Sequence, residues 1–297
     1  MEDSRRHVKA ILDAVYGDPV ASLRLAPDGR SSFTYLVDFD APRDKVVCKI
    51  GGQSVYTDEV VEPLVIERIG HRTSIPVPQV LETGTLPNRR HPDNRWALYS
   101  HLDGFTPREF DLLPIETRER ILTEVGAYLA ELHTTCTYEH FGAFGRDGEE
   151  LQLKKVGLAE MVFWGHRLTD VLGQVEEGEQ SPVLSHGDLF PGNLLIGDEG
   201  SILGIIDWAN AHVTTPGDSL ARAELRFIDW FRPEPTDRTT LKVALREGYQ
   251  RHCPLPEGFA TRGWLYKLIW LAQSGVWALG HLATPHGRRQ LQRTLRG

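Results

Sequence analysis

Residues 186–196 read HGDLFPGNLLI, and residues 205–208 read IIDW. His186 stands two places before Asp188, Asn193 follows five places after that Asp, and Asp207 ends a short aliphatic run. Phosphoryl transfer needs such a set, because a carboxylate must accept the proton of the attacking hydroxyl group and hard oxygen ligands must hold Mg²⁺ on the phosphates. The pattern therefore predicts that Asp188 is a catalytic carboxylate and that Asn193 and Asp207 are metal ligands.

Each of these residues also has an ordinary structural explanation. Asp188 could close an Asx turn, Asn193 could cap a loop and Asp207 could cap a helix. Their combination at fixed spacing favours the functional interpretation, and it has the spacing of the protein-kinase pattern H-R-D-x-x-x-x-N followed by D-F-G. The sequence departs from that pattern, since Gly187 stands in place of the Arg and Trp208 follows Asp207.

The composition indicates a globular protein with two lobes. The chain has 297 residues, 40% of them hydrophobic and 25% charged, which is long for one core and suits two lobes with a cleft between them. A formal net charge of −8 argues against nucleic acid as the main partner. The three widely spaced cysteines form neither a disulfide framework nor a zinc site, which favours a reducing cytoplasm.

No membrane segment is expected. Residues 1–6 are polar and contain no apolar signal region. The longest apolar stretch, residues 264–282, is interrupted by Lys267 and other polar residues. We therefore expect a buried helix there and no partner membrane.

The first hundred residues read as a helix followed by a sheet. Ser4 can cap a first helix that ends at Gly17. Short β-type runs separated by turns then predict an antiparallel meander, with strands over residues 20–25, 33–39, 45–50 and 96–99. The turn at residues 27–32 contains Ser31 and Ser32 and could be a plain hairpin turn or a phosphate-covering loop.

Lys49 is a single cation within the apolar strand 45–50. A lysine that is buried there needs an anionic partner, whereas a lysine on an edge strand would discourage aggregation. Candidate partners on the following predicted helix, residues 58–69, are Glu59, Glu62 and Glu67. Pro63 interrupts that helix and leaves the choice between Glu59 and Glu62 open.

Helices dominate after about Leu102. Helical spacing of apolar residues predicts helices over residues 116–133, 156–175, 236–252, 264–282 and 287–295. Residues 189–206 read as a small hairpin with the candidate catalytic groups at its ends. We predict an α+β fold with an N-lobe of residues 1–102 and a helical C-lobe of residues 103–297. His133 ends a helix and is expected to be structural.

The HGD-x-x-x-x-N stretch followed by IDW, together with Leu-Ala-x-Leu-His at residues 129–133, resembles the aminoglycoside phosphotransferase family of small-molecule kinases. The resemblance extends from about Val20 to about Ala283. It implies a bilobal protein-kinase-like fold with ATP and Mg²⁺ in the cleft and a small-molecule alcohol bound among the C-lobe helices.

The resemblance also implies roles for residues outside the motif. Lys49 would hold the nucleotide phosphates, and the family spacing favours Glu62 as its partner. Ser31 and Ser32 would lie over the phosphates. Tyr99 and His101 stand at the linker against which adenine binds.

Two further residues belong with the catalytic stretch. His186, grouped with Asp188 as catalytic, would brace the loop by hydrogen bonds. Asp218 would support the loop, or would simply cap the helix that begins near Pro216.

The acceptor cannot be chosen from the sequence among aminoglycosides, sugars and amino alcohols. A polycation would need an acidic pocket, for which Glu160, Glu224 and Asp229 are candidates, although each could equally be a helix surface residue. Aromatic residues could build an acceptor pocket or belong to the core. They are Trp164, Trp230, Phe231, Trp264, Trp270 and Trp277. A protein Ser/Thr kinase and a nucleotide-binding pseudokinase are the rival interpretations, and the oligomeric state is open.

Overall fold

The structure is a computed structural model that describes most of the chain. The described residues are 2–26, 32–40, 44–51, 61–86, 95–107, 109–147, 150–154, 181–231 and 233–273. Several expectations lie outside them. These are Ser31, Glu59, Glu160, Trp164, Trp277, the predicted helices 156–175 and 287–295, and the end of the helix predicted over 264–282.

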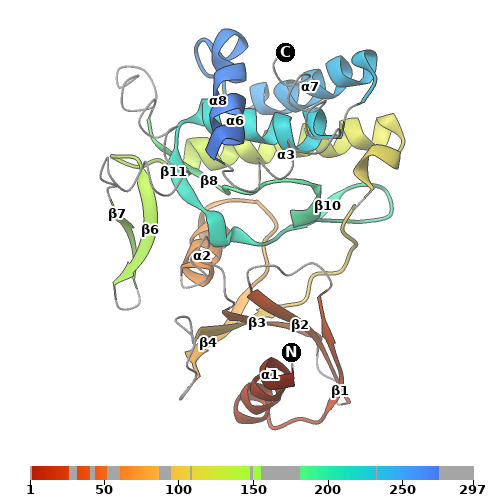
Figure 1. Cartoon of the computed structure of the whole chain (residues 1–297), viewed down its shortest axis with the longest axis vertical. Helices are drawn as coiled ribbons and strands as arrows, with labels where there is room; N and C mark the ends of the chain where they lie inside the picture. The colour runs from red at the N-terminus through yellow and green to blue at the C-terminus, as the bar shows by residue number, and fades with distance from the viewer. Residues whose placement is uncertain are drawn as a thin grey trace.

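The N-terminal part is a five-stranded antiparallel sheet with strand order β1-β2-β3-β5-β4 (Figure 1). Its strands are β1 Val20–Leu25, β2 Ser32–Phe39, β3 Val46–Gly51, β4 Val80–Thr85 and β5 Arg95–Ser100. Val46, Cys48 and Ile50, which alternate along β3, are buried. Strands form here because β-branched and aromatic side chains alternate with polar ones, so one face can be covered by a helix.

Helix α1, Glu2–Val15, covers one face of this sheet. Val8, Ile11 and Leu12 recur at helical spacing and pack against the sheet residues. The expectation that Ser4 caps the helix is wrong. Ser4 lies inside α1, and its hydroxyl group makes a 2.8 Å hydrogen bond with the Tyr35 hydroxyl, which joins the helix to β2.

Helix α2, Glu62–Arg72, lies between the sheet and the helical part of the molecule (Figure 1). Pro63 occupies the first turn, where its missing N–H group costs no hydrogen bond. Glu62 is therefore the first helical residue and is buried.

Two long helices that run in the same direction form the base of the C-terminal part, with Arg118 bonded to Asp237 near their starts and His133 to Tyr249 near their ends. They are α3, Ile115–Thr135, and α7, Pro235–Gln250. Gly126 and Gly248 lie where the helices cross, and a Cβ atom at either position would collide with the backbone of the opposite helix. His133 is buried on α3, and its Nδ1 lies 2.9 Å from the Tyr249 hydroxyl oxygen. Burial lowers the pKa of His133 to about 3, so it is a neutral core residue at pH 7.

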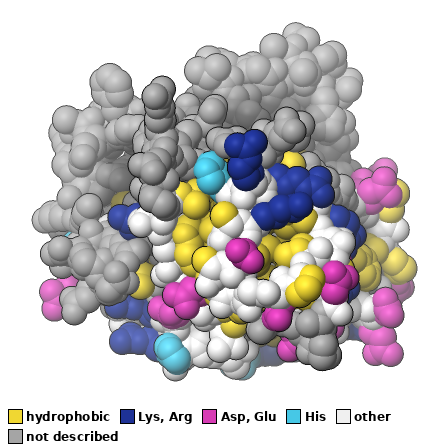
Figure 2. Space-filling model, turned by 90° about the horizontal axis from the view of Figure 1, so that it is seen from below, with side chains coloured by type: hydrophobic (Ala, Val, Ile, Leu, Met, Phe, Trp, Pro, Cys, Tyr) yellow, Lys and Arg dark blue, Asp and Glu magenta, His cyan; other side chains and the backbone are white. Residues whose placement is uncertain are grey.

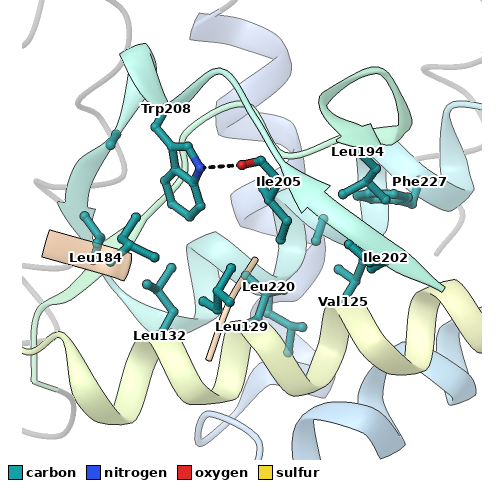
Figure 3. Close-up of a cluster of buried hydrophobic side chains, with 14 of the residues drawn as sticks. Val125, Leu129, Leu132, Leu184, Leu194, Ile202, Ile205, Trp208, Leu220 and Phe227 are labelled. Carbon is teal, nitrogen blue, oxygen red and sulfur yellow. Dashed lines mark hydrogen bonds between the residues drawn. The ribbon is translucent and has the colours of Figure 1, made fainter. Parts of the chain in front are cut away.

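The predicted hairpin lies above α3. Its strands are β9 Leu194–Ile196 and β10 Ile202–Ile205, which pair antiparallel. Figure 3 shows the core beneath it, where Leu129 and Leu132 of α3 lie close to Ile205 and Trp208. This packing fixes the hairpin, and with it the candidate catalytic groups at its ends, on a rigid base.

The remaining elements surround this hairpin. A four-stranded sheet has the order β7-β6-β11-β8, with β6 Gly142–Asp147, β7 Glu150–Lys154, β8 Val183–Ser185 and β11 His212–Thr214. Helix α6 is Pro216–Glu224, the π-helical turn η4 is Leu225–Asp229 and helix α8 is Phe259–Gln273. The short 3₁₀ turns are η1 Phe110–Leu112, η2 Pro191–Asn193 and η3 Trp208–Asn210.

In the described part of the face shown in Figure 2, several Lys and Arg side chains lie close together, with apolar and acidic side chains beside them. Among the described helices, none is both long and apolar enough to cross a membrane.

Candidate active site

Lys49 joins three elements that are far apart in the sequence. Its Nζ lies 2.8 Å from Oε2 of Glu62 on α2 and 2.8 Å from Oδ1 of Asp207 after β10. Lys49 is not an edge-strand residue, because β3 pairs with β2 on one side and with β5 on the other. Its side chain is 11% exposed, so the two carboxylates supply the anionic partners that a buried ammonium group needs.

Glu62 connects Lys49 to the Ile-Asp-Trp stretch. Its other carboxylate oxygen, Oε1, accepts a 3.0 Å hydrogen bond from the backbone N–H of Trp208. The Trp208 indole N–H donates to the Ile205 carbonyl oxygen at 3.0 Å, as Figure 3 shows, and its ring is buried. The tryptophan thus anchors the segment that presents Asp207.

Asp207 stands at a turn in the left-handed region of backbone conformation, with φ 65° and ψ 62°. Asp tolerates this conformation better than most residues, and the turn directs the chain away from β10 immediately after the strand. The neighbouring Lys49 ammonium lowers the pKa of Asp207 despite burial, so this carboxylate is ionised at neutral pH.

His186 uses both of its ring nitrogens within the loop. Nδ1 accepts a 3.3 Å hydrogen bond from the Asp188 backbone N–H, so Nε2 carries the proton that is donated to the Ile206 carbonyl oxygen at 3.0 Å. Burial lowers the pKa of His186 to about 4, which keeps this neutral tautomer at pH 7. The histidine thereby ties the start of the 186–196 stretch to the residue before Asp207.

Asp188 is partly accessible to solvent, with 32% of its side chain exposed. Asn193 donates from Nδ2 to the Asp188 backbone carbonyl at 2.8 Å, which holds the loop closed and leaves the Asn193 amide oxygen for another partner. One oxygen of the Asp188 carboxylate, Oδ1, accepts a 2.9 Å bond from Nη2 of Arg226. Burial raises the pKa of Asp188 above its ordinary value, and the positive charge of Arg226 opposes that rise.

Gly187 makes the loop possible. Its φ is +79°, and a Cβ atom there would collide with the Asn210 carbonyl group. The arginine of the protein-kinase pattern therefore has no room at this position.

Asp218 lies behind the loop and does not cap its helix. The cap of α6 is Thr215, whose hydroxyl oxygen accepts from the Asp218 backbone N–H at 3.1 Å. The Asp218 carboxylate accepts from the Thr214 hydroxyl at 3.1 Å and pairs with Nε of Arg222 at 2.8 Å. Asp218 thus fixes α6 against β11, the strand beside the one that leads into His186.

Asn193 and Asp207 fit a Mg²⁺ site. The Ile206 backbone N–H donates to the Asn193 carbonyl oxygen at 3.0 Å, which brings the two candidate ligands to neighbouring positions. Both offer hard oxygen donors, and Mg²⁺ usually takes one or two protein oxygens and completes its shell with water and phosphate. Within the described residues, no group of three or more His, Cys, Asp and Glu side chains could hold a metal, so a closed protein cage is not formed there.

The structure places the other predicted nucleotide contacts as follows. Tyr99 is buried, and its hydroxyl group lies 3.4 Å from Oε2 of Glu62. The backbone N–H of His101 donates to the Lys45 carbonyl oxygen at 3.3 Å, and the His101 ring lies 3.7 Å from Asp103. Ser32 begins β2 opposite Gly51. The nucleotide roles of these residues stay predictions.

Glu224 and Asp229 are neither surface residues nor free carboxylates. Glu224 is 1% and Asp229 3% exposed. Lys267 of α8 contacts both, at 2.7 Å and 2.8 Å, while Arg246 pairs with Glu224 at 2.6 Å and Lys242 with Asp229 at 3.2 Å. Both expectations for these two residues, an acidic pocket or a helix surface, are therefore wrong.

Sequence reasoning missed Arg226, which contacts the candidate catalytic carboxylate. The signal was present, because a single arginine interrupts the apolar run from Leu225 to Ile228. The reason that it meets Asp188 is tertiary, since the other residues of this π-helical turn are buried in the core.

Comparison with known proteins identifies the family. The profile described as "Phosphotransferase enzyme family" matches residues 22–255, and the chain belongs to this family. It is a phosphotransferase that acts on hydroxyl groups of small molecules, with a protein-kinase-like α+β fold, as expected from the resemblance. A search of curated proteins found no match.

Solved structures support the fold at low sequence identity. One is a complex of aminoglycoside phosphotransferase APH(4)-Ia with AMP-PNP and hygromycin B, at 19% identity, 97% coverage of both chains and a TM-score of 0.64. A gentamicin complex of APH(2″)-IIa is 14% identical, with 98% of this chain and 96% of that chain covered and a TM-score of 0.60. A microcompartment-associated aminopropanol kinase is 17% identical, with 97% and 94% covered and a TM-score of 0.58.

Proposed function

We propose that this protein transfers the γ-phosphate of ATP to a hydroxyl group of a small molecule and that it does so with Mg²⁺. The observation that carries the proposal is the bridge from Lys49 to Glu62 and Asp207, which assembles β3, α2 and the segment after β10 around one ammonium group. Family membership and kinase neighbours that bind AMP-PNP or ATP support the use of ATP.

Each residue then has one task. Asp188 accepts the proton of the acceptor hydroxyl group, and its second oxygen, Oδ2, is the one that Arg226 does not bond. Lys49 binds the nucleotide phosphates and is held in place by Glu62. Asn193 and Asp207 would hold Mg²⁺, which would neutralise charge on the transferred phosphate. His186 holds the loop so that Asp188 and Asp207 keep their relative positions.

Positioning and electrostatics would supply most of the rate enhancement. A phosphoryl transition state is loose, so the protein gains most by aligning the hydroxyl group with the phosphate and by compensating charge. The hydrophobic core under the hairpin of β9 and β10 suits this task, because rigid elements hold catalytic groups more precisely than mobile loops do.

Two rival interpretations remain open to test. A protein Ser/Thr kinase would carry Arg at position 187 and Asp-Phe-Gly at 207–209, and this chain has Gly187 and Asp207-Trp208-Ala209. A pseudokinase would bind nucleotide without turnover. We place the reaction in the cytoplasm, which is consistent with free Cys48, Cys136 and Cys253.

An ADP-release screen tests the proposal. Purified protein is incubated with ATP and Mg²⁺ and with aminoglycosides, sugars, amino alcohols or hydroxy acids, with the Asp188→Asn variant as the matched control. We expect acceptor-dependent ADP release by the wild type alone. Absence of both ADP release and thermal stabilisation by ATP with Mg²⁺ would exclude the kinase assignment, and phosphorylation of generic protein acceptors would favour the protein-kinase interpretation.

A further inference from the structure

Arg226 lies directly beside the candidate catalytic carboxylate. Its Nη2 donates to Oδ1 of Asp188 at 2.9 Å, so the guanidinium group lies next to the oxygen atoms that would meet the acceptor hydroxyl group. The arginine side chain is 15% exposed and that of Asp188 is 32% exposed, so solvent reaches part of the pair. Any acceptor whose hydroxyl group reaches Asp188 must therefore also come close to a guanidinium group.

Aromatic rings surround the guanidinium group and fix its orientation. Its central carbon lies 4.3 Å from the ring centroid of Phe190, 5.3 Å from that of Trp270 and 5.8 Å from that of Trp230. Trp230 and Trp270 also contact each other edge to face at 6.3 Å. A guanidinium group with rings around it presents its N–H donors along its edge, and this geometry matches carboxylate and phosphate oxygens.

The turn that carries Arg226 is rigid. In the π-helical turn η4, Leu225, Phe227, Ile228 and Asp229 are buried, and Arg226 points away from that core. Asp229 at the end of the turn is held by Lys242 and Lys267. A π-helical turn often marks a functional site, because the extra residue redirects a side chain.

The charges around this pair do not favour a polycation. Glu224 and Asp229, the described candidates for an acidic pocket, are buried and already paired with Lys242, Arg246 and Lys267, which are three cations against two carboxylates. The partly exposed carboxylate of Asp188 is itself paired with Arg226. Among the described residues, an acceptor ammonium group that approached Asp188 would therefore meet the positive charge of Arg226.

We propose that Arg226 is a specificity-determining residue that binds an anionic oxygen group, a carboxylate or a phosphate, on the alcohol acceptor. This inference rests on the proposed function and narrows its substrate class to hydroxy acids or phosphorylated alcohols. One guanidinium nitrogen bonds Asp188, and among the described residues no other hydrogen bond to Arg226 competes for the remaining N–H donors. The Arg226 guanidinium group also contacts Asp188, the proposed catalytic base. The anionic group of the acceptor must therefore lie close to its reacting hydroxyl group, which indicates a compact acceptor.

Paired acceptors test this inference. ADP release is measured with glycerate against glycerol, with glucose 6-phosphate against glucose, and with kanamycin as a cationic acceptor. Glycerate against glycerol tests recognition of a carboxylate, and glucose 6-phosphate against glucose tests recognition of a phosphate. The variants are Arg226→Gln, which removes the charge, and Arg226→Lys, which keeps it, with Arg251→Gln on the exposed end of α7 as the control. Thermal stabilisation by glycerate and by inorganic phosphate, with ATP and Mg²⁺ present, gives a binding readout that does not need turnover.

We expect the wild type to prefer an anionic acceptor, and Arg226→Gln to lower kcat/KM for it about 10- to 100-fold, the usual value of a hydrogen bond to a charged group. Neutral acceptors should lose much less, Arg226→Lys should keep part of the preference and Arg251→Gln should keep all of it. Equal losses for charged and neutral acceptors would show a purely structural role and overturn the proposal. So would a wild-type preference for neutral or cationic acceptors, or the lack of both turnover and binding with every anionic probe. A wild type that neither binds ATP with Mg²⁺ nor releases ADP with any acceptor would instead refute the proposed function.

Discussion

Replacing Lys49 with Met is the sharpest test of how the site is assembled. The substitution keeps most of the side-chain volume and removes the charge that Glu62 and Asp207 share. The Glu62 carboxylate is 3% exposed, whereas that of Asp207 is 37% exposed. Most of the lost stability should therefore come from the unpaired, buried Glu62 carboxylate, because water can solvate Asp207 in the absence of the lysine.

The expected cost follows from this difference in burial. Removing one partner of a buried ion pair costs roughly 3–5 kcal/mol, because it leaves an uncompensated charge, while a half-exposed pair contributes about 0–1 kcal/mol. For 297 residues the entropy of unfolding is on the order of 0.6 kcal/mol per degree, so Tm should fall by about 5–8 °C. Adding Glu62→Gln to Lys49→Met removes the uncompensated charge and should restore part of the loss.

Urea unfolding of the two single variants and the double variant measures the coupling between Lys49 and Glu62. Lys45→Met is the matched control, because Lys45 is 57% exposed and its 3.3 Å pair with Asp38 lies at the surface. In the wild type, ATP with Mg²⁺ at about 100 times its dissociation constant should add ~2.7 kcal/mol, and Lys49→Met should lose most of this. A Lys49→Met protein with wild-type stability, no coupling to Glu62 and full ATP stabilisation would refute the reasoning.

Three further predictions concern catalysis, the metal and pH. Asp188→Asn should bind ATP normally but lower kcat on a responsive acceptor ~10²–10⁴-fold, and a kcat within about threefold of wild type would contradict a catalytic role. Asp207→Ala should remain folded and lose Mg²⁺-dependent turnover in a metal titration, whereas full activity at ordinary Mg²⁺ would exclude it as a ligand. Burial raises the pKa of Glu224, but Lys267 and Arg246 lower it more, so its net pKa lies below the ordinary value. The stabilisation by the ionised Glu224 carboxylate is therefore complete above about pH 4.5 and is lost as the pH falls through the lower pKa of the folded state. Glu224→Gln should be less stable than the wild type at pH 7 by roughly 3–5 kcal/mol, and it should lose less stability between pH 7 and 3. Equal losses of unfolding free energy in the two proteins over that range would contradict this role of Glu224.

Local sequence predicted the elements because local interactions fix them. Alternation of apolar residues located β3, and helical spacing located α3 to within two residues at each end. Asp188 and Asn193 are only five residues apart, and the turn at η2 between them lets the Asn193 amide group reach the Asp188 carbonyl oxygen. The boundary between lobes near Leu102 stays a prediction.

Packing decided what local sequence left open. Pro63 allowed either Glu59 or Glu62 as the partner of Lys49, and the start of α2 at Glu62 placed that carboxylate beside the ammonium group. Glu224 looked like a helix surface residue, yet Lys267, 43 residues away, made its burial possible.

The sequence by itself determined the family resemblance and predicted the chemistry of the site, because His186, Asp188, Asn193 and Asp207 have the residue types and spacing of a phosphotransferase motif. Only the tertiary structure decided which charges meet there. Lys49 reaches Asp207 across 158 residues, and Arg226 reaches Asp188 across 38. Such contacts depend on how helices and strands pack, and a buried charge is stable only where that packing brings a partner within hydrogen-bond distance.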